Sequence, residues 1–435
     1  MKFEGSLALQ KRFHAAIPGG SHTYAKGDDR FPERMPPYIV RGKGSHVWDA
    51  DGNEFIEYGG GLRAVTLGHA YEPVVEAAAR QMRLGANFIR PATIELEAAE
   101  MLLGFIEGAE MVKFAKNGSD ANSAAIRVSR AYTGRDRIAV CASHPFFSVD
   151  DWFIGTTPMA AGIPQAIRDL TVQFHYNDLE SVKTLFHDHP GEIACLILEP
   201  EKERAPKDGF LHEVQDLCRR NGTVFILDEI ITGFRWHMGG AQKFHGIVPD
   251  LSTFGKALGN GFSVAALAGK REILRLGGLE HDRERVFLAS ATHGAETHSL
   301  AAAMEVMRTY RREPVIETLW RQGERLAGGL NEAIRECRVE GHVSIEGRPC
   351  CLVYVAKDQR GEPSLPFRTL LLSEILKRGI LASSLVVSYS HTGEDIDRTV
   401  EAFREGFKVY RRALDEGVEK YLEGRPVKPV MRRFN

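Results

Sequence analysis

Short apolar runs alternate with longer amphipathic stretches through the central part of the chain. The apolar runs are rich in Val and Ile and occupy residues 111–114, 137–141, 193–198, 224–227 and 264–268. The stretches between them include residues 121–132 and 211–221, where apolar positions recur at helical spacing. Such runs are typical of parallel strands buried on both faces. The alternation predicts an α/β fold with a mostly parallel sheet flanked by helices.

The two ends of the chain follow a different pattern. Residues 47–51 and 53–58 predict a β-hairpin with Asp51 and Gly52 at its turn. The part after residue 305 begins with one long helix and ends with another at residues 396–419. We therefore expect a large domain at residues 66–305. Residues 1–65 and 306–435 are expected to pack together as a smaller α/β domain.

Composition and charge narrow the classes of function. The chain has 435 residues, of which 43% are hydrophobic and 26% charged, as is usual for globular proteins. Its 56 Lys and Arg nearly balance 58 Asp and Glu, which gives a net charge of −2. This balance provides no field that would attract nucleic acid or an anionic membrane. No stretch has the apolar core of a signal peptide or the length of a transmembrane helix.

The cysteines and histidines indicate neither a disulfide framework nor a metal site. Six cysteines are spread over the chain without a CxxC pair. No histidine cluster has the spacing of metal ligands. We expect free thiols, a cytoplasmic protein and no bound metal.

A glycine-rich segment follows the first apolar run and opens a helix. It reads Lys116-Asn117-Gly118-Ser119-Asp120-Ala121-Asn122. Free backbone N–H groups, the helix dipole and a hydroxyl would meet there, which is the arrangement that binds a phosphate. An ordinary turn with a helix cap has the same residues, so this segment alone does not decide between the two.

Two further residues extend the phosphate interpretation. Asp228 ends an apolar run, where an α/β sheet gathers ligands, although a helix cap or a structural ion pair would explain it equally well. Lys256 lies among small residues and glycines, surroundings that favour a lysine with a lowered pKa that forms a Schiff base. A phosphate site, an acid and a lysine in this order match the needs of pyridoxal 5′-phosphate (PLP).

The chain resembles the class III (subgroup II) aminotransferases of PLP fold type I, and within them the proteins similar to glutamate-1-semialdehyde 2,1-aminomutase. The resemblance extends from about residue 13 to residue 405. It is carried by the motifs Pro18-Gly19-Gly20, Trp48-Asp49-Ala50-Asp51-Gly52, Leu67-Gly68-His69, Asn117-Gly118-Ser119-Asp120-Ala121, Tyr132-Thr133-Gly134-Arg135, Glu199-Pro200, Asp228-Glu229-Ile230-Ile231-Thr232-Gly233-Phe234-Arg235 and Thr253-Phe254-Gly255-Lys256.

The resemblance implies roles for the residues that handle the cofactor. Lys256 would form the imine with PLP and shuttle the proton, and Asp228 would pair with the pyridinium nitrogen. Ile230 would lie against one ring face, while Gly118 and Ser119 would bind the phosphate.

The resemblance implies cofactor contacts for two more residues, each of which has a structural alternative. Phe146 is expected to stack on the cofactor ring, because Phe146-Phe147-Ser148 stands where the family has Tyr-His-Gly. Ordinary core packing is the alternative for this ring. Glu199 is expected near the cofactor, with a strand-end ion pair as its alternative.

The resemblance also implies a homodimer whose active site lies at the interface. Family members send a threonine to the phosphate of the neighbouring subunit. The corresponding stretch here, residues 291–300, is longer by about two residues. Thr292 is our choice for this contact, with Thr297 as the second option.

The predicted substrate site departs from the aminomutase pattern. Lys26 aligns with an arginine that binds the substrate carboxylate there, and lysine keeps the charge without the planar fork. A solvated surface lysine is the alternative. The departure favours a transaminase that moves an amino group from a donor, L-glutamate, to an aldehyde or ketone of a small polar metabolite. The alternative is glutamate-1-semialdehyde 2,1-aminomutase. A racemase or a decarboxylase on the same scaffold is favoured less. The presence of both Lys256 and Asp228 argues against an inactive binding protein.

Overall fold

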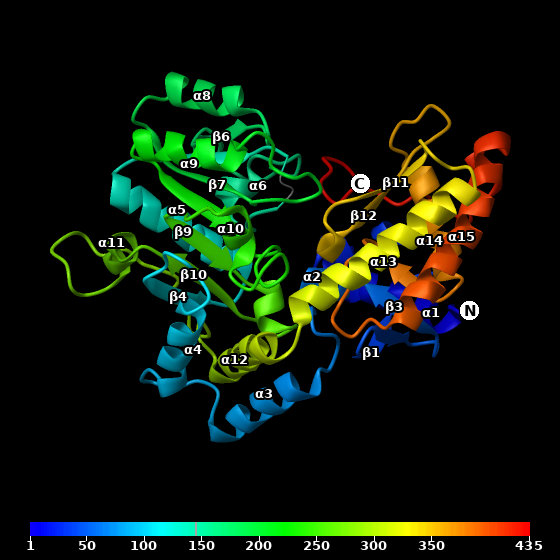
Figure 1. Ribbon diagram of the computed structural model, residues 1–435, viewed down its shortest axis with the longest axis horizontal. Helices are drawn as coiled ribbons and strands as arrows, with labels where there is room; N and C mark the ends of the chain where they lie inside the picture. Colours follow the sequence, from blue (N-terminus) through cyan, green and yellow to red (C-terminus); the bar gives the residue numbers. More distant parts are fainter. Residues whose placement is uncertain (144–145) are drawn as a thin grey trace. The chain divides into compact units, whose positions relative to one another are not determined.

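The computed structural model describes residues 1–143 and 146–435 and divides the chain into two units. The smaller unit combines Met1–Tyr71 with Glu317–Arg432, and the larger comprises Glu72–Ile316 with Arg433–Asn435. In Figure 1 the smaller unit accordingly contains the dark blue start of the chain and its orange to red last part. The expected boundaries, after residues 65 and 305, lie before those of the structure.

The larger unit is built on a seven-stranded, mostly parallel sheet. Its strand order is β4-β10-β9-β8-β7-β5-β6, with only β10 antiparallel to its neighbours. The strands span β4 (Met111–Ala115), β5 (Arg137–Cys141), β6 (Thr171–Phe174), β7 (Ile193–Leu198), β8 (Val224–Asp228), β9 (Leu251–Phe254) and β10 (Ala265–Gly269). The prediction of an α/β fold with such a sheet is confirmed.

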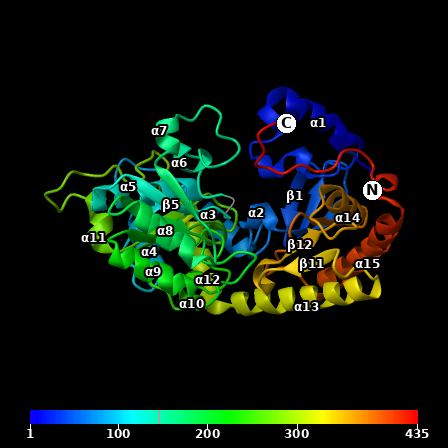
Figure 2. The ribbon, with the colours of Figure 1, turned by 90° about the horizontal axis from the view of Figure 1, so that it is seen from above.

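Helices cover both faces of this sheet (Figures 1 and 2). The helices of the larger unit are α3 (Glu72–Leu84), α4 (Thr93–Leu103), α5 (Gly118–Thr133), α6 (Asp151–Ile154), α7 (Gln165–Arg168), α8 (Leu179–Asp188), α9 (Phe210–Arg220), α10 (Gly240–His245), α11 (Arg271–Leu274) and α12 (Thr297–Arg312). Alternate residues of β5 face opposite sides: Ile138 and Val140 share a core with α5, while Ala139 and Cys141 share one with α8 and α9. This burial on both faces explains why the strands read as continuous apolar runs.

The smaller unit joins the two ends of the chain through one mixed sheet. Its order is β1-β2-β3-β13, and β13 lies parallel to β3 although more than 300 residues separate them in sequence. The hairpin of β2 and β3 turns at Gly52, whose positive φ of 81° suits glycine. The strands span β1 (Ile39–Lys43), β2 (His46–Asp49), β3 (Glu54–Tyr58) and β13 (Ile380–Ala382), with a separate pair β11 (Val343–Glu346) and β12 (Val353–Ala356). A smaller α/β domain built from both ends was predicted, and the mixed sheet confirms this part of the fold class.

Five α-helices and several short 3-10 turns complete the smaller unit. The helices are α1 (Glu4–Ala16), α2 (Gly60–Arg63), α13 (Val315–Glu336), α14 (Leu365–Leu376) and α15 (Gly393–Glu416). Two consecutive 3-10 turns, η2 (Tyr24–Lys26) and η3 (Asp28–Arg30), follow α1. The segment after α15 runs beside these turns: the Lys428 N–H donates to the Asp29 carbonyl at 2.9 Å, and Arg432 pairs with the Asp29 carboxylate at 2.7 Å. Figure 2 shows this red C-terminal segment close to the blue N-terminal elements.

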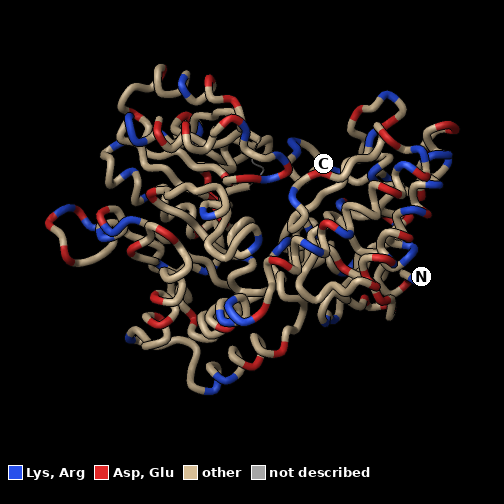
Figure 3. The backbone as a smooth tube through the Cα atoms, in the orientation of Figure 1, with Lys and Arg blue, Asp and Glu red and all other residues tan. Residues whose placement is uncertain are grey.

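Basic and acidic residues are interspersed along the backbone of both units, as the small net charge implies (Figure 3). Within residues 1–143 and 146–435, no helix combines the length and the apolar character that crossing a bilayer requires.

Candidate active site

Asp228 and Lys256 come from neighbouring strands of the larger unit. Asp228 ends β8 and stands opposite Thr253 of the parallel strand β9. Lys256 follows two residues after the end of β9, with a left-handed φ of 45°. This conformation is unfavourable for a residue with a Cβ atom, and such strain concentrates at functional sites. The positive charge of Lys256 acts on Asp228, where it opposes the rise in the pKa of Asp228 that burial causes, so these two predicted residues lie within electrostatic reach of each other.

The Asp228 carboxylate is buried but well supplied with hydrogen bonds. Its Oδ1 accepts from the Ile230 N–H at 2.9 Å, and its Oδ2 accepts from Asn122 Nδ2 at 2.9 Å. Burial, with the negative charge of Glu199 as the second cause, raises the pKa of Asp228 to about 7. A second cation beside Asp228, in addition to Lys256, would lower this pKa and favour the ionised carboxylate. Glu199, directly after β7, therefore lies within electrostatic reach of Asp228, as its predicted place near the cofactor requires.

The predicted phosphate segment forms the N-terminus of α5, a helix of 16 residues. Asn117 caps it by accepting from the Asp120 N–H at 3.0 Å. Ser119 is buried, and its hydroxyl oxygen accepts from the Val149 N–H at 3.1 Å. The cap and the phosphate site, alternatives at the level of sequence, are compatible here: the cap uses the N–H of Asp120 and leaves the dipole of the helix directed at a ligand.

Ile230 connects the phosphate segment with the lysine segment. A Cβ atom on Gly118 would lie 3.0 Å from Ile230 Cδ1, and one on Gly255 would lie 3.1 Å from the same atom. The lack of a side chain on these two glycines therefore lets the Ile230 side chain pack directly against both segments. An amine, a buried carboxylate, a helix N-terminus and an aliphatic side chain fit the aldehyde, the pyridine nitrogen, the phosphate and one face of the flat ring of PLP.

Phe146 is separated from the core by its neighbour. Its side chain is 45% exposed and meets the ring of Phe153 edge-on, with 5.8 Å between centroids. Phe147 is buried, and its carbonyl accepts from Asn122. The exposed ring of Phe146 is therefore available to a ligand, and its role as the stacking ring stays a prediction.

The two threonines proposed for the dimer contact differ in their surroundings. Thr297 begins α12, is buried, and donates its hydroxyl to the Gly85 carbonyl at 2.7 Å. Thr292 is exposed, and its carbonyl accepts from Asn87 Nδ2 at 3.1 Å. Only the Thr292 side chain is therefore placed at the surface, which favours it over Thr297 for a contact with a second chain.

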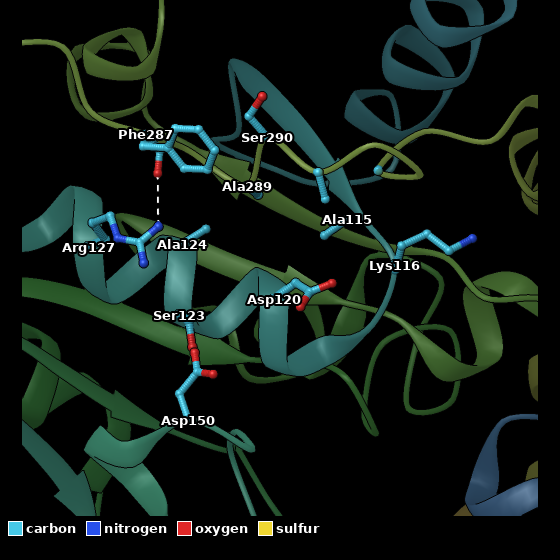
Figure 4. Close-up of a pocket in the computed structure, with 12 residues that line it drawn as sticks. Ala115, Lys116, Asp120, Ser123, Ala124, Arg127, Asp150, Phe287, Ala289 and Ser290 are labelled. Carbon is cyan, nitrogen blue, oxygen red and sulfur yellow. Dashed lines mark hydrogen bonds between the residues drawn. The ribbon is translucent and has the colours of Figure 1, made fainter. Parts of the chain in front are cut away.

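The segment that carries Thr292 lies against α5 (Figure 4). Arg127 Nη1 donates to the Phe287 carbonyl at 3.1 Å, and Lys116 pairs with Glu296. Between α5 and residues 287–294 lies a cavity of about 160 Å³, which Asp120 and Ser123 also line. These bonds at both ends hold the loop that presents Thr292.

Lys26 lies in the smaller unit, at the end of η2. Its side chain is exposed and lines a cavity of about 330 Å³. The same cavity is lined by Phe13 and Tyr38, whose ring centroids are 4.6 Å apart, and by His22. The lining also includes the carboxylate of Asp28, so the cavity offers an aromatic side together with groups of both charges.

Sequence reasoning missed Asn122 and Thr253. Asn122 Nδ2 donates to Asp228 Oδ2, and Thr253 Oγ1 donates to Asn122 Oδ1 at 2.7 Å. Asn122 follows Ser119 by three residues and so shares its helix face, which is a usable signal for a polar residue turned inward. Nothing in the sequence names its partners, because both lie more than 100 residues away.

Comparisons with known proteins agree with this geometry. The family model described as Aminotransferase class-III matches residues 29–403. The chain is 32% identical to the glutamate-1-semialdehyde 2,1-aminomutase of Acetivibrio thermocellus, over 92% of the chain and 97% of that protein. It is 29% identical to the 3-aminobutyryl-CoA aminotransferase of Cloacimonas acidaminovorans, over 95% and 99%. A solved structure of the Sphingopyxis sp. MTA144 FumI protein with PLP matches 95% of the chain and 98% of its own at a TM-score of 0.86 and 27% identity.

Proposed function

Because the chain belongs to the class III aminotransferase family, we propose that it moves an amino group from a separate donor, L-glutamate, to an aldehyde or ketone of a small polar metabolite. The protein is a PLP-dependent transaminase or aminomutase, and PLP is its cofactor. The arrangement of Lys256, Asp228 and the α5 N-terminus around Ile230 is the observation that supports amino transfer.

Each residue has a definite task in this proposal. Bound PLP supplies an electron sink for negative charge at the amino-bearing carbon of the substrate. Lys256 Nζ takes the proton from that carbon and returns it. Asp228 holds the proton on the ring nitrogen, and its buried carboxylate is stabilised in the ionised form by that cation. Gly118 and Ser119 bind the phosphate through the end of α5.

Lys26 is proposed to bind a carboxylate of the substrate. An ammonium group offers a point charge where the resemblance expects a guanidinium fork, which supports a substrate other than glutamate-1-semialdehyde. The relatives include transaminases with different substrates, among them the 3-aminobutyryl-CoA aminotransferase. The second candidate function, glutamate-1-semialdehyde 2,1-aminomutase, is supported by the 32% identity to such an enzyme.

One assay separates these two functions. The purified protein with PLP is given L-glutamate and a panel of aldehydes and ketones, and release of 2-oxoglutarate is measured. A parallel reaction contains glutamate-1-semialdehyde without a donor. Release of 2-oxoglutarate without isomerisation supports the transaminase, whereas isomerisation without a donor supports the aminomutase.

We also propose a homodimer in which Thr292 reaches the phosphate site of the second copy. The chain around the partner residue of Thr292, Asn87, exposes large apolar side chains. They are Met82, Leu84, Phe88, Ile89 and Leu96, of which Ile89 is fully exposed. Exposed apolar groups of this kind mark interaction surfaces.

Sedimentation analysis of the protein, alone and as Ile89→Asp, tests the dimer. A wild-type dimer and a weakened Ile89→Asp dimer support it, and a wild-type monomer with full activity contradicts it. Thr292→Val should weaken PLP binding without changing the sedimentation of the dimer. For location we propose the cytoplasm, because the six cysteines are free thiols.

A further inference from the structure

The side-chain amide of Asn122 forms hydrogen bonds with residues from three different parts of the larger unit. It lies in α5 and is 1% exposed. Its Nδ2 donates to Asp228 Oδ2 at 2.9 Å and to the Phe147 carbonyl at 2.7 Å. Its Oδ1 accepts from Thr253 Oγ1 at 2.7 Å. One side chain therefore joins the phosphate helix to the end of β8, to β9 and to the segment that carries Phe146.

The partners fix the orientation of this amide. A carboxylate and a carbonyl accept hydrogen bonds but do not donate them, so both require the NH₂ group of Asn122. The opposite orientation would place the amide oxygen against two acceptors. The amide oxygen of Asn122 then faces the Thr253 hydroxyl, which donates its hydrogen to that oxygen.

We propose that Asn122, held in orientation by Thr253, is a positioning residue that keeps the Asp228 carboxylate ionised and aimed at the ring nitrogen. The proposal rests on the proposed role of Asp228. The hydrogen bond stabilises the charged form of the carboxylate, and it is made from the same helix that binds the phosphate. Asn122 thereby sets the distance between the two anchors of the cofactor.

The groups around Asp228 determine how its protonation should change when Asn122 is replaced. Glu199 and burial favour the protonated carboxyl, while Lys256, the Ile230 N–H and Asn122 favour the carboxylate. Without the Asn122 amide, one of these supports is lost and Asp228 takes up a proton at higher pH. The ring nitrogen then holds its own proton less firmly, so the chemical step slows while binding of the amino donor is unaffected.

The test compares Asn122→Leu, Thr253→Val and a control, Ser129→Ala, each as PLP-loaded protein with L-glutamate as donor. Ser129 is buried in the same helix, and its hydroxyl donates to the Ala125 carbonyl one turn away. The measurements are kcat, the KM for L-glutamate, and the pH midpoint of the cofactor absorption band. The dissociation constant of PLP is measured on the cofactor-free protein.

We expect Asn122→Leu to lower kcat by about 10- to 100-fold, in the range of a hydrogen bond to a charged group, with KM within about twofold. The pH midpoint of the absorption band should shift, and PLP should dissociate more readily. Thr253→Val should act in the same direction by about three- to tenfold, and Ser129→Ala should match the wild type. A normal kcat and an unchanged midpoint in Asn122→Leu would overturn the proposal. If Asn122→Leu does not fold, Thr253→Val decides by the same criteria.

A double-mutant cycle separates this proposal from the role of Asp228. In an Asp228→Asn background, Asn122→Leu should have little further effect, because the carboxylate that it supports is gone. Full additivity of the two changes would contradict positioning through Asp228. A near-normal rate in Asp228→Asn alone would instead overturn the proposed role of Asp228.

Discussion

The residues proposed for the cofactor and the residue proposed for the substrate are held in very different ways. Asp228 is buried, and its carboxylate accepts from a backbone N–H and from an amide that is itself fixed by two other groups. Lys26 is exposed on a short 3-10 turn. The next turn, η3, is attached to the C-terminal segment through Asp29, which binds Lys428 and Arg432.

This difference teaches which part of the chemistry is free to vary. A buried network of mutually dependent hydrogen bonds tolerates few substitutions, because each change leaves a polar group without a partner. Short turns held by single, partly exposed ion pairs change at less cost. The C-terminal segment lies beyond residues 29–403, the part that matches the family model. In this proposal, reaction type and substrate choice thus depend on separate regions.

The largest effect is expected at Lys256. Lys256→Ala removes the group that forms the imine and moves the proton, so turnover should fall by about 10⁴-fold or more. The fold should survive, because the change shortens one half-buried side chain on a strained turn. Steady-state amino transfer and circular dichroism measure the two effects. A folded variant that keeps most of the wild-type rate would contradict the role of Lys256 in forming the imine and moving the proton.

The next largest effect is expected at Asp228. Asp228→Asn leaves the shape of the site but provides a neutral amide beside the ring nitrogen, so kcat should fall by about 10²- to 10³-fold. PLP should still bind, as absorbance titration would show. A rate close to that of the wild type would mean that another acid, with Glu199 as the first choice, performs this task.

The burial of Asp228 also predicts a pH dependence of stability for the cofactor-free protein. The folded pKa of about 7 is above the ordinary value of 3.8, so the folded chain binds this proton more tightly than the unfolded chain. The free energy of unfolding should therefore fall as the pH rises from about 4 to about 7. Glu229, with a pKa raised by burial to about 7, acts in the same direction.

Denaturant unfolding at a series of pH values tests this. Asp228→Asn should flatten the dependence and be more stable than the wild type at pH 8, because no charge is then buried. Glu229→Gln is the comparison for the remaining slope. An identical slope in the wild type and Asp228→Asn would contradict the raised pKa.

A smaller effect is expected at Lys26. If it binds a substrate carboxylate, Lys26→Ala should raise the KM for that substrate by the equivalent of about 1.5–3 kcal/mol, with kcat and the cofactor spectrum unchanged. Lys43, exposed on β1, provides the control Lys43→Ala. Equal kinetics of wild type and Lys26→Ala with every substrate would return Lys26 to the solvated surface.

The smallest effect is expected at Arg432. Arg432→Ala removes the ion pair with Asp29, a surface pair worth up to about 1 kcal/mol, so the KM of the carboxylate substrate should rise at most about fivefold. The neighbouring exposed Arg433 gives the control Arg433→Ala. A loss of kcat in Arg432→Ala, rather than a change in KM, would contradict the separation of the two regions.

Strands could be predicted from the sequence where the chain is continuously apolar, and much less well where polar residues interrupt it. Strands β7 and β8 are continuous apolar runs, and both were predicted from the sequence. Strand β9, which leads to Lys256, was missed because Ser252 and Thr253 interrupt its apolar pattern. The Thr253 hydroxyl donates to Asn122. The polar residue that interrupts the apolar pattern of β9 is therefore part of the candidate site.

The candidate site divides in the same way. The motifs identified the family and the cofactor, and both are confirmed by the comparisons. The roles of Lys256, Asp228 and Lys26 stay predictions. The Asn122 network was out of reach for the sequence, since it depends on which strand ends become neighbours. The antiparallel direction of β10 likewise follows from the connection of the chain and not from its composition.

One measurement tests the central claim most directly: the amount of 2-oxoglutarate released when L-glutamate is added to the PLP-loaded protein without an acceptor. We predict a single burst close to one equivalent per Lys256, together with loss of the visible cofactor band, and no burst in Lys256→Ala. Absence of the burst in a wild-type protein that isomerises glutamate-1-semialdehyde would contradict the claim that a separate donor supplies the amino group.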